Sequence, residues 1–302
     1  MVVGFRGLGR VAMALAVALA FGLLATTAAC TTGSSDGRVK VVASMYPLAW
    51  AVQRVGGDRV AVEDLTPPGV EAHDTTLTAG QRADIQTSDV VVYLGQIGLQ
   101  PDIERAVADA GGRVVDVTAG LHIPAPAGQT FDPHVWLDPV YIEGAVKLIA
   151  GALKAVDASG SAGFAAREAS TLRDLRALDA SFRAELDKCA YTTFVVTHEA
   201  FGYLADRYGL HQLGIEGITP ESEPSAARIQ QAAQAIAQGR AAPAVFYEGT
   251  DAGRRIGESV AANVGVPALP LGTLESAPSS GDYVSVMRAN LASLEWGLQC
   301  TA

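Results

Sequence analysis

Short β-branched runs alternate with amphipathic segments along the first half of the chain. Residues 39–44 (VKVVAS) form such a run, and apolar residues then recur at helical spacing over residues 47–55 before two glycines. The same alternation predicts strands at 60–65, 90–94 and 113–117, and helices at 78–86 and 101–110. Strands that alternate with helices indicate an α/β fold with a mostly parallel sheet.

The pattern restarts after two helical segments. Residues 140–156 predict an amphipathic helix, and residues 163–186 carry an apolar stripe on a charged segment that is unusually long for one helix. Further strands are predicted at 191–197, 212–215, 244–247 and 268–271, and helices at 200–208, 225–237, 254–264 and 282–298, with Ser225 as an N-cap. We therefore expect two similar α/β lobes, at 38–161 and 189–302, joined by a rigid linking helix at 162–188.

The N-terminus has the pattern of a secretory signal. Arg6 and Arg10 precede an apolar run over residues 11–24, which is shorter than the roughly 20 residues of a membrane span. The segment TAAC, ending at Cys30, resembles the lipobox of bacterial lipoproteins. We expect residues 1–30 to be a signal peptide, Cys30 to carry a lipid anchor to the outer face of the cytoplasmic membrane, and residues 31–37 to be a flexible tether. A lipobox usually has leucine where this chain has Thr27, so plain cleavage to a periplasmic protein is the alternative.

Composition and charge limit the kinds of molecule that the protein is expected to bind. The chain has 302 residues and a formal net charge of -10, with no basic stripe, which argues against nucleic acid. An acidic field favours the approach of cations, although solubility alone explains such a charge. Beyond Cys30, the remaining cysteines are Cys189 and Cys300, and in an exported chain an even number predicts a disulfide; two buried thiols are the alternative.

Three of the five histidines have informative positions. His73 follows the predicted strand 60–65, and His198 ends the strand 191–197. His134 lies between two Asp-Pro steps in FDPHVWLDP, where the prolines restrict the backbone. Ligands bind at the carboxyl ends of parallel strands, so the three imidazoles can converge in one cleft. Neutral imidazoles suit Zn²⁺, with an oxygen ligand or water in the fourth position.

Outside these three histidines, few residues or motifs indicate a binding or catalytic role. His122 and His211 fit structural roles better than ligation. HExxH, GxSxG and Walker A motifs are absent from the sequence. Glu199, next to His198, would be the general base if the protein were a zinc-dependent hydrolase, which is the rival hypothesis from the enzyme class.

The chain resembles the metal-binding solute-binding proteins of ABC importers, a cluster with zinc-specific and manganese-specific receptors. The matching segments include FDPHVWLDP, VVTHEAFGYLADRYGL and GITPESEPSAARI, within residues 39–298. The resemblance implies two lobes on one long helix with the metal between them. It also implies a monomeric receptor, not an enzyme, that captures Zn²⁺ outside the cytoplasm and delivers it to a membrane permease.

The resemblance also implies a ligand set. Its first three ligands correspond to His73, His134 and His198. Manganese-type members have glutamate at the third position, so His198 favours zinc, and a manganese receptor or an adhesin-like surface protein is the alternative. The usual fourth ligand, an aspartate, corresponds to Gly272, which has no side chain. We favour Glu248 in its place, and the other candidates are Glu275, Asp251, Glu71 or a water molecule. Carboxylates that are near a histidine in sequence and can orient it are Asp74, Asp132, Asp138 and Glu199.

Overall fold

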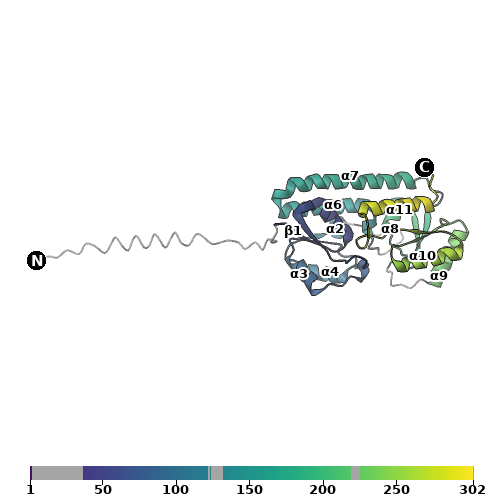
Figure 1. Cartoon of the computed structure of the whole chain (residues 1–302), viewed down its shortest axis with the longest axis horizontal. Coiled ribbons are helices and arrows are strands. Elements are labelled where there is room, and N and C mark those ends of the chain that lie inside the picture. The colour runs from purple at the N-terminus through teal and green to yellow at the C-terminus, as the bar shows by residue number, and fades with distance from the viewer. Residues whose placement is uncertain (2–36, 122, 124–131, 219–224, 302) are drawn as a thin grey trace. The chain divides into compact units, whose positions relative to one another are not determined.

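The computed structural model describes residues 1, 37–121, 123, 132–218 and 225–301 (Figure 1). The predicted signal peptide beyond its first residue, Cys30, the tether up to residue 36 and His122 lie outside the described residues. Residues 37–302 form one compact unit, and the description below concerns that unit.

The first half of this unit contains a four-stranded parallel sheet. Its strands are β1 (Val39–Ala43), β2 (Val60–Asp64), β3 (Val90–Tyr93) and β4 (Arg113–Asp116). Their order is β2-β1-β3-β4, with Val39 opposite Val60 and Val41 opposite Val90. The chain therefore passes from one side of β1 to the other, and the carboxyl ends of all four strands share one edge.

The second half repeats this topology. Its strands are β5 (Thr193–Val196), β6 (His211–Gly214), β7 (Val245–Tyr247) and β8 (Ala268–Pro270). Their order is β6-β5-β7-β8, and every pair is parallel. Two similar sheets with the same strand order confirm the predicted α/β class.

Helices cover both faces of each sheet. The helices are α2 (Tyr46–Gly56), α3 (Ala79–Thr87), α4 (Pro101–Val107), α5 (Val117–Leu121), α6 (Pro139–Val156), α7 (Ser161–Leu186), α8 (Gly202–Arg207), α9 (Ala226–Ala237), α10 (Asp251–Val264) and α11 (Tyr283–Gly297). Short 3₁₀ turns are η1 (Gly57–Arg59), η2 (Ala72–Asp74), η3 (Val135–Leu137) and η4 (Ala158–Gly160). Alternate strand residues point to opposite faces: Val41 packs in the core that contains α2 and α6, whereas Val42 packs with α3 and α4.

Helix α7 runs along both halves, as Figure 1 shows. It has 26 residues, or about 39 Å at 1.5 Å per residue. Phe164 near its start and Phe182 near its end are both fully buried in one hydrophobic core that contains residues of both halves. This confirms the predicted long helix, which begins at Ser161, two residues before the start of the predicted segment.

Polar contacts also join the halves directly. The Arg207 guanidinium on α8 pairs with the buried Asp138 carboxylate at 2.6 Å, and Asp138 also caps the start of α6. The Tyr283 hydroxyl on α11 donates to the Trp136 carbonyl at 2.7 Å. A partly buried ion pair and a buried hydrogen bond of this kind hold the two halves in place, because separating the halves would leave polar groups unpaired.

The ends of several elements follow local signals in the sequence. Thr78 and Gln81 form a capping box at α3. Ser225 caps α9 by accepting from the Arg228 backbone N–H, and this cap is the one that the sequence predicts. The short helix α5 was not predicted, because its apolar start continues the strand pattern of β4. The predicted helix 200–208 is shorter in the structure, since α8 begins at Gly202.

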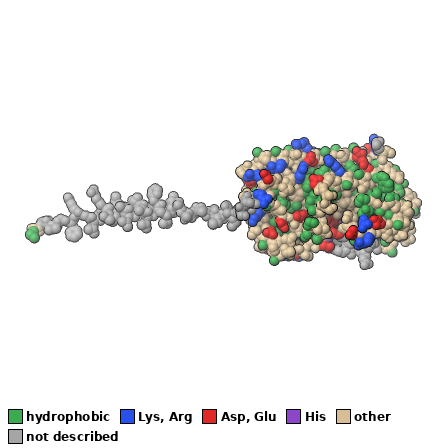
Figure 2. Space-filling model, in the orientation of Figure 1, with side chains coloured by type: hydrophobic (Ala, Val, Ile, Leu, Met, Phe, Trp, Pro, Cys, Tyr) green, Lys and Arg blue, Asp and Glu red, His purple; other side chains and the backbone are tan. Residues whose placement is uncertain are grey.

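A disulfide links the segment after α7 to the segment after α11. It joins Cys189 to Cys300, which confirms the predicted pairing. Among the described helices, none combines the length and apolar character that a membrane crossing requires. On the face shown in Figure 2, Lys and Arg side chains are interspersed with Asp and Glu and form no basic stripe.

Candidate metal centre

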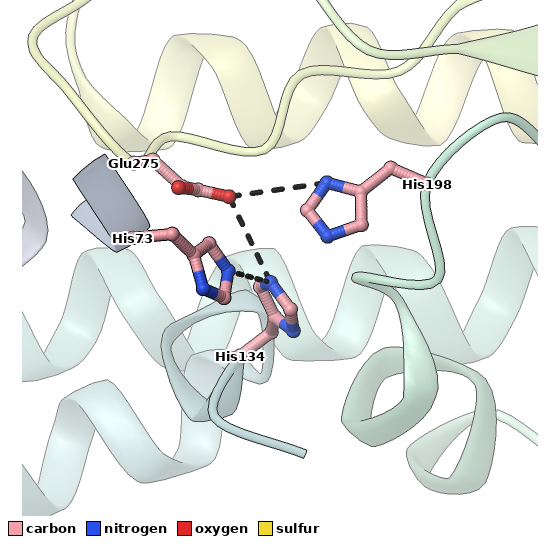
Figure 3. A group of neighbouring side chains, drawn as sticks. All are labelled: His73, His134, His198 and Glu275. Carbon is pink, nitrogen blue, oxygen red and sulfur yellow. Dashed lines mark hydrogen bonds and ion pairs between the residues drawn. The ribbon is translucent and has the colours of Figure 1, made fainter. Parts of the chain in front are cut away.

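Four side chains from four separate loops meet between the two halves. They are His73, His134, His198 and Glu275, and their candidate ligand atoms all lie within 4.8 Å of one another (Figure 3). The three histidines are those that the sequence singles out, and the structure brings them together. Glu275 replaces Glu248, the favoured sequence-based candidate, as the carboxylate of this group.

The backbone explains why these loops meet. His73 lies in η2, after β2, and His198 lies two residues beyond the end of β5. Both therefore sit at the carboxyl edge of a parallel sheet. His134 immediately precedes η3, and Glu275 lies in the loop after β8. Two residues come from each half, so the site spans the boundary between them.

His134 is the most constrained imidazole of the group. It is fully buried, and Asp132 Oδ1 lies 2.8 Å from its Nδ1 and accepts its backbone N–H at 2.9 Å. Burial opposes the charged form, but the hydrogen bond to Asp132 and the negative charges of Asp132 and Glu275 outweigh burial and raise the pKa of His134 to about 9. Asp132 holds a proton on Nδ1, which leaves Nε2 as the nitrogen that faces the other histidines.

The pKa of His73 is lowered, whereas that of His134 is raised. Its Nε2 lies 3.3 Å from His134 Nε2. Burial lowers the pKa of His73 to about 4; the Glu275 carboxylate opposes this shift, and the neighbouring His134 and His198 reinforce it. The ring is therefore neutral near pH 7, with a lone pair available for a metal.

His198 is held from both sides of its ring. Nε2 lies 2.9 Å from the Ile218 carbonyl, and Nδ1 lies 2.9 Å from Glu248 Oε2. Burial opposes its charge, but the hydrogen bond to Glu248 raises the pKa of His198 overall. A carbonyl only accepts, so Nε2 carries a proton. Nδ1, which lies 4.0 Å from Glu275 Oε1, is the nitrogen that can release a proton and face the site.

Glu275 carries the only carboxylate of the group and is 3% exposed. Its Oε2 accepts the Ala72 backbone N–H at 2.9 Å, whereas Oε1 is buried without a conventional hydrogen-bond partner, 3.7 Å from His134 Nε2. Burial opposes ionisation, but His134 outweighs it and lowers the pKa of Glu275 to about 2. A buried carboxylate oxygen that faces imidazole nitrogens without a hydrogen bond has the environment of a cation ligand.

The other candidate carboxylates lie outside this group. Glu248 is buried, but its oxygens contact His198 Nδ1 and the Thr250 hydroxyl. Glu71 is partly buried; burial, followed by the charges of Glu248 and Glu275, raises its pKa to about 7. Asp251 is exposed and faces Arg254 at 3.5 Å.

Of the predicted orienting carboxylates, Asp132 is the one that the described residues show hydrogen-bonded to a histidine of the group. Asp138 pairs with Arg207, and Glu199 Oε2 lies 3.3 Å from the Arg228 guanidinium, so Glu199 is not placed as a base at the site. His211 begins β6 and is exposed. His198 is oriented instead by the Ile218 carbonyl at Nε2, a backbone contact that the sequence does not reveal, and Glu248 contacts Nδ1, the nitrogen that faces Glu275.

A groove of about 840 Å³ leads to Glu275. Its walls come from both halves and include Glu71, Thr250, Asp251 and Ser276. Ser276 also fastens the two walls, because its hydroxyl accepts the Gly69 backbone N–H at 3.2 Å. Of the four residues of the group, Glu275 is the one among the described lining residues of this groove.

Fold and site together define a two-lobed α/β protein with a candidate metal centre between its halves. The chain belongs to the family described as zinc-uptake complex component A, periplasmic (ZnuA), whose model matches residues 41–297. This confirms the family resemblance seen in the sequence.

Three relatives illustrate how similar the chain is to individual proteins, and each is less than 30% identical to it. The chain is 29% identical over 283 residues to the zinc-binding lipoprotein AdcA of Streptococcus pneumoniae, covering 86% of this chain and 56% of AdcA. It is 27% identical to the high-affinity zinc uptake system protein ZnuA of Bacillus subtilis, covering 88% of this chain and 90% of that protein. The structure of the Zn(II)-bound ZnuA-like domain of S. pneumoniae AdcA matches with a TM-score of 0.75 and 28% identity, covering 87% of this chain and 99% of that domain. The chain thus spans about half the length of AdcA.

Proposed function

We propose that this protein is an extracytoplasmic receptor that captures Zn²⁺ with His73, His134, His198 and Glu275 and passes it to an ABC-type importer. The observation that carries the proposal is the buried, unpartnered Oε1 of Glu275, which faces three imidazoles. A cation bound among these side chains would give that oxygen the partner it lacks.

The donor set supports zinc. Three imidazole nitrogens and one carboxylate oxygen make a four-coordinate set of the kind that Zn²⁺ takes in proteins. Mn²⁺ prefers more oxygen ligands and a higher coordination number. The second carboxylate oxygen is already engaged by the Ala72 N–H, so Glu275 offers one oxygen rather than two. The manganese alternative therefore lacks a specific observation in its favour.

The protonation of the histidines supports reversible binding of the metal. His134 and His198 have raised pKa values, and each faces a carboxylate other than Glu275, respectively Asp132 and Glu248. A metal must displace a proton from each charged ring before it binds. This competition moderates affinity and is consistent with a site that releases its cargo.

Export and docking are parts of the same proposal. Residues 1–30 would direct export, Cys30 would carry a lipid anchor, and residues 31–37 would tether the folded unit to the membrane. The predicted segments 38–161, 162–188 and 189–302 would form the two lobes and their connecting helix. The partner would be the permease subunit of the importer, and the receptor would act as a monomer.

Calorimetry on chelator-stripped protein tests the proposal. The wild-type protein should bind one Zn²⁺, and His134→Ala should weaken binding sharply while the far-UV circular dichroism stays unchanged. Unaltered zinc affinity in a folded His134→Ala variant would refute the assignment. Metal-dependent hydrolysis that disappears in Glu199→Gln, with metal still bound, would instead support the enzyme alternative.

A further inference from the structure

The loop between β8 and Glu275 is held by one buried amide. Asn290, on α11, is 2% exposed. Its Oδ1 accepts the Gly272 backbone N–H at 2.7 Å, and its Nδ2 donates to the Gly272 carbonyl at 2.8 Å. Both polar backbone groups of Gly272 are therefore paired with one side chain, as if with a neighbouring strand. Only an amide offers a donor and an acceptor in this arrangement.

The close approach of α11 explains the glycine. A Cβ at residue 272 would lie 2.9 Å from Val286 Cγ1, which also belongs to α11. A side chain there would require Val286 or the loop to shift. The aspartate that the family resemblance leads one to expect at this position therefore does not fit the packing as it stands.

Beyond Gly272, the loop turns toward the histidines. Leu274 has φ 57°, in the left-handed region that residues other than glycine seldom adopt, and it is 5% exposed. The Thr273 carbonyl accepts the Trp136 Nε1–H at 2.7 Å. The strained turn is thus held on one side by Asn290 and on the other by Trp136, two residues after His134 in the sequence.

We propose that Asn290 is a positioning residue for the Glu275 carboxylate and acts through the backbone of Gly272. This inference rests on the proposed function, because it concerns the fourth ligand of the same site. Without the amide, the Gly272 peptide would have two unpaired polar groups against α11, and the loop would move to hydrate them. Glu275 would then lose its fixed distance to the histidines, although every ligand side chain would still be present.

Asn290→Leu, alone and combined with Glu275→Gln, tests this role. Zinc affinity is measured by competition with a chromophoric chelator, and the visible absorption of bound Co²⁺ reports the ligand geometry. Asn290→Leu should weaken zinc binding roughly 10- to 100-fold and change the Co²⁺ spectrum toward that of Glu275→Gln. In the Glu275→Gln background it should have little further effect, because its influence passes through Glu275.

Leu294→Ala is the matched control, since Leu294 is fully buried on the same helix. It should lower the melting temperature and leave zinc affinity and the Co²⁺ spectrum unchanged. Should Asn290→Leu fail to fold, Asn290→Ala removes the amide without adding bulk. Failure of both variants to fold would overturn the inference, because Asn290 would then serve the fold as a whole.

The possible results distinguish a failure of this inference from a failure of the proposed function. If the wild-type protein binds zinc and His134→Ala abolishes binding, but folded Asn290→Leu binds normally, the positioning role is wrong and the receptor stands. If Asn290→Leu reduced zinc affinity by the same factor in the wild-type protein and in the Glu275→Gln background, the positioning role of Asn290 would also be wrong. If the wild-type protein binds no zinc, the proposed function fails and this inference fails with it.

Discussion

Glu275 Oε2 accepts the backbone N–H of Ala72 at 2.9 Å, so a carboxylate of the second half is fastened to the turn that carries His73. The other oxygen of the same carboxylate faces the three imidazoles. One side chain thereby links the closure of the two halves to the geometry of the metal site.

Glu275→Gln should lower zinc affinity at least about tenfold, or about 1.4 kcal/mol. The amide has one acceptor, which cannot serve both Ala72 and the metal. Glu248→Gln is the comparison, because Glu248 contacts His198 but lies outside the group, and it should have the smaller effect. Competition titrations of both variants measure this difference. A larger loss in Glu248→Gln would restore Glu248 as the fourth ligand.

Zinc binding should release protons near pH 7. The pKa of His134 is raised to about 9 in the metal-free protein, so its ring is doubly protonated below that pH, whereas the metal needs a free lone pair. Affinity should therefore decrease as the pH falls below about 9, by up to about tenfold per pH unit for each displaced proton. Calorimetry at pH 7 in buffers of different ionisation enthalpy counts these protons. A binding enthalpy independent of the buffer would contradict the assigned protonation.

Asp64, which lies outside the four-residue group, should make the free energy of unfolding depend on pH. Burial raises its pKa to about 7, although its hydrogen bond from the Thr66 N–H opposes the shift. Because the folded-state pKa is raised, the contribution of Asp64 to stability is present below pH 4 and is lost as the pH rises through about 7.

Asp64→Asn keeps an oxygen for the Thr66 N–H but cannot ionise. Its free energy of unfolding should increase relative to the wild type between pH 4 and pH 8. Urea unfolding of both metal-free proteins at several pH values measures the difference, and other groups cancel in the comparison. A difference that is the same at every pH would show that Asp64 does not titrate in this range.

Removing the disulfide should lower stability without affecting the metal. Cys189 and Cys300 are separated by 111 residues, so the bond restricts a long loop in the unfolded chain. Cys189→Ala with Cys300→Ala should reduce the free energy of unfolding by about 2 to 5 kcal/mol. Denaturant unfolding checks this, with zinc titration as the control. Loss of zinc affinity in a folded double variant would mean that the disulfide also shapes the site.

Much of the site follows from sequence because strand ends are easy to place. His73 lies in the loop that follows one predicted parallel strand and His198 follows another, and ligands bind at the carboxyl edge of each such sheet. Glu248 follows β7 and obeys the same rule, so the sequence correctly brings it near His198. The sequence does not distinguish Glu248, which contacts His198 but lies outside the four-residue group, from Glu275, which lies within reach of all three imidazoles.

Glu275 depends on features that a periodic pattern does not reveal. It lies beyond the last residue of β8 in an irregular loop, and its direction is set by the left-handed conformation of Leu274, which leucine seldom adopts. The pairing of Asn290 with Gly272 joins residues of different elements. Such tertiary contacts bring Glu275 into the four-residue group, whereas the sequence indicated that the usual aspartate is missing and left Glu275 as one of several candidates.

The most direct test of the receptor is a competition between metals. Chelator-stripped protein is dialysed against equal concentrations of Zn²⁺ and Mn²⁺, and the bound metals are measured by elemental analysis, with His134→Ala in parallel. The wild-type protein should hold one zinc and almost no manganese, and the variant should hold little of either. Manganese in the wild-type protein, or full zinc occupancy in His134→Ala, would contradict a zinc site built on these histidines.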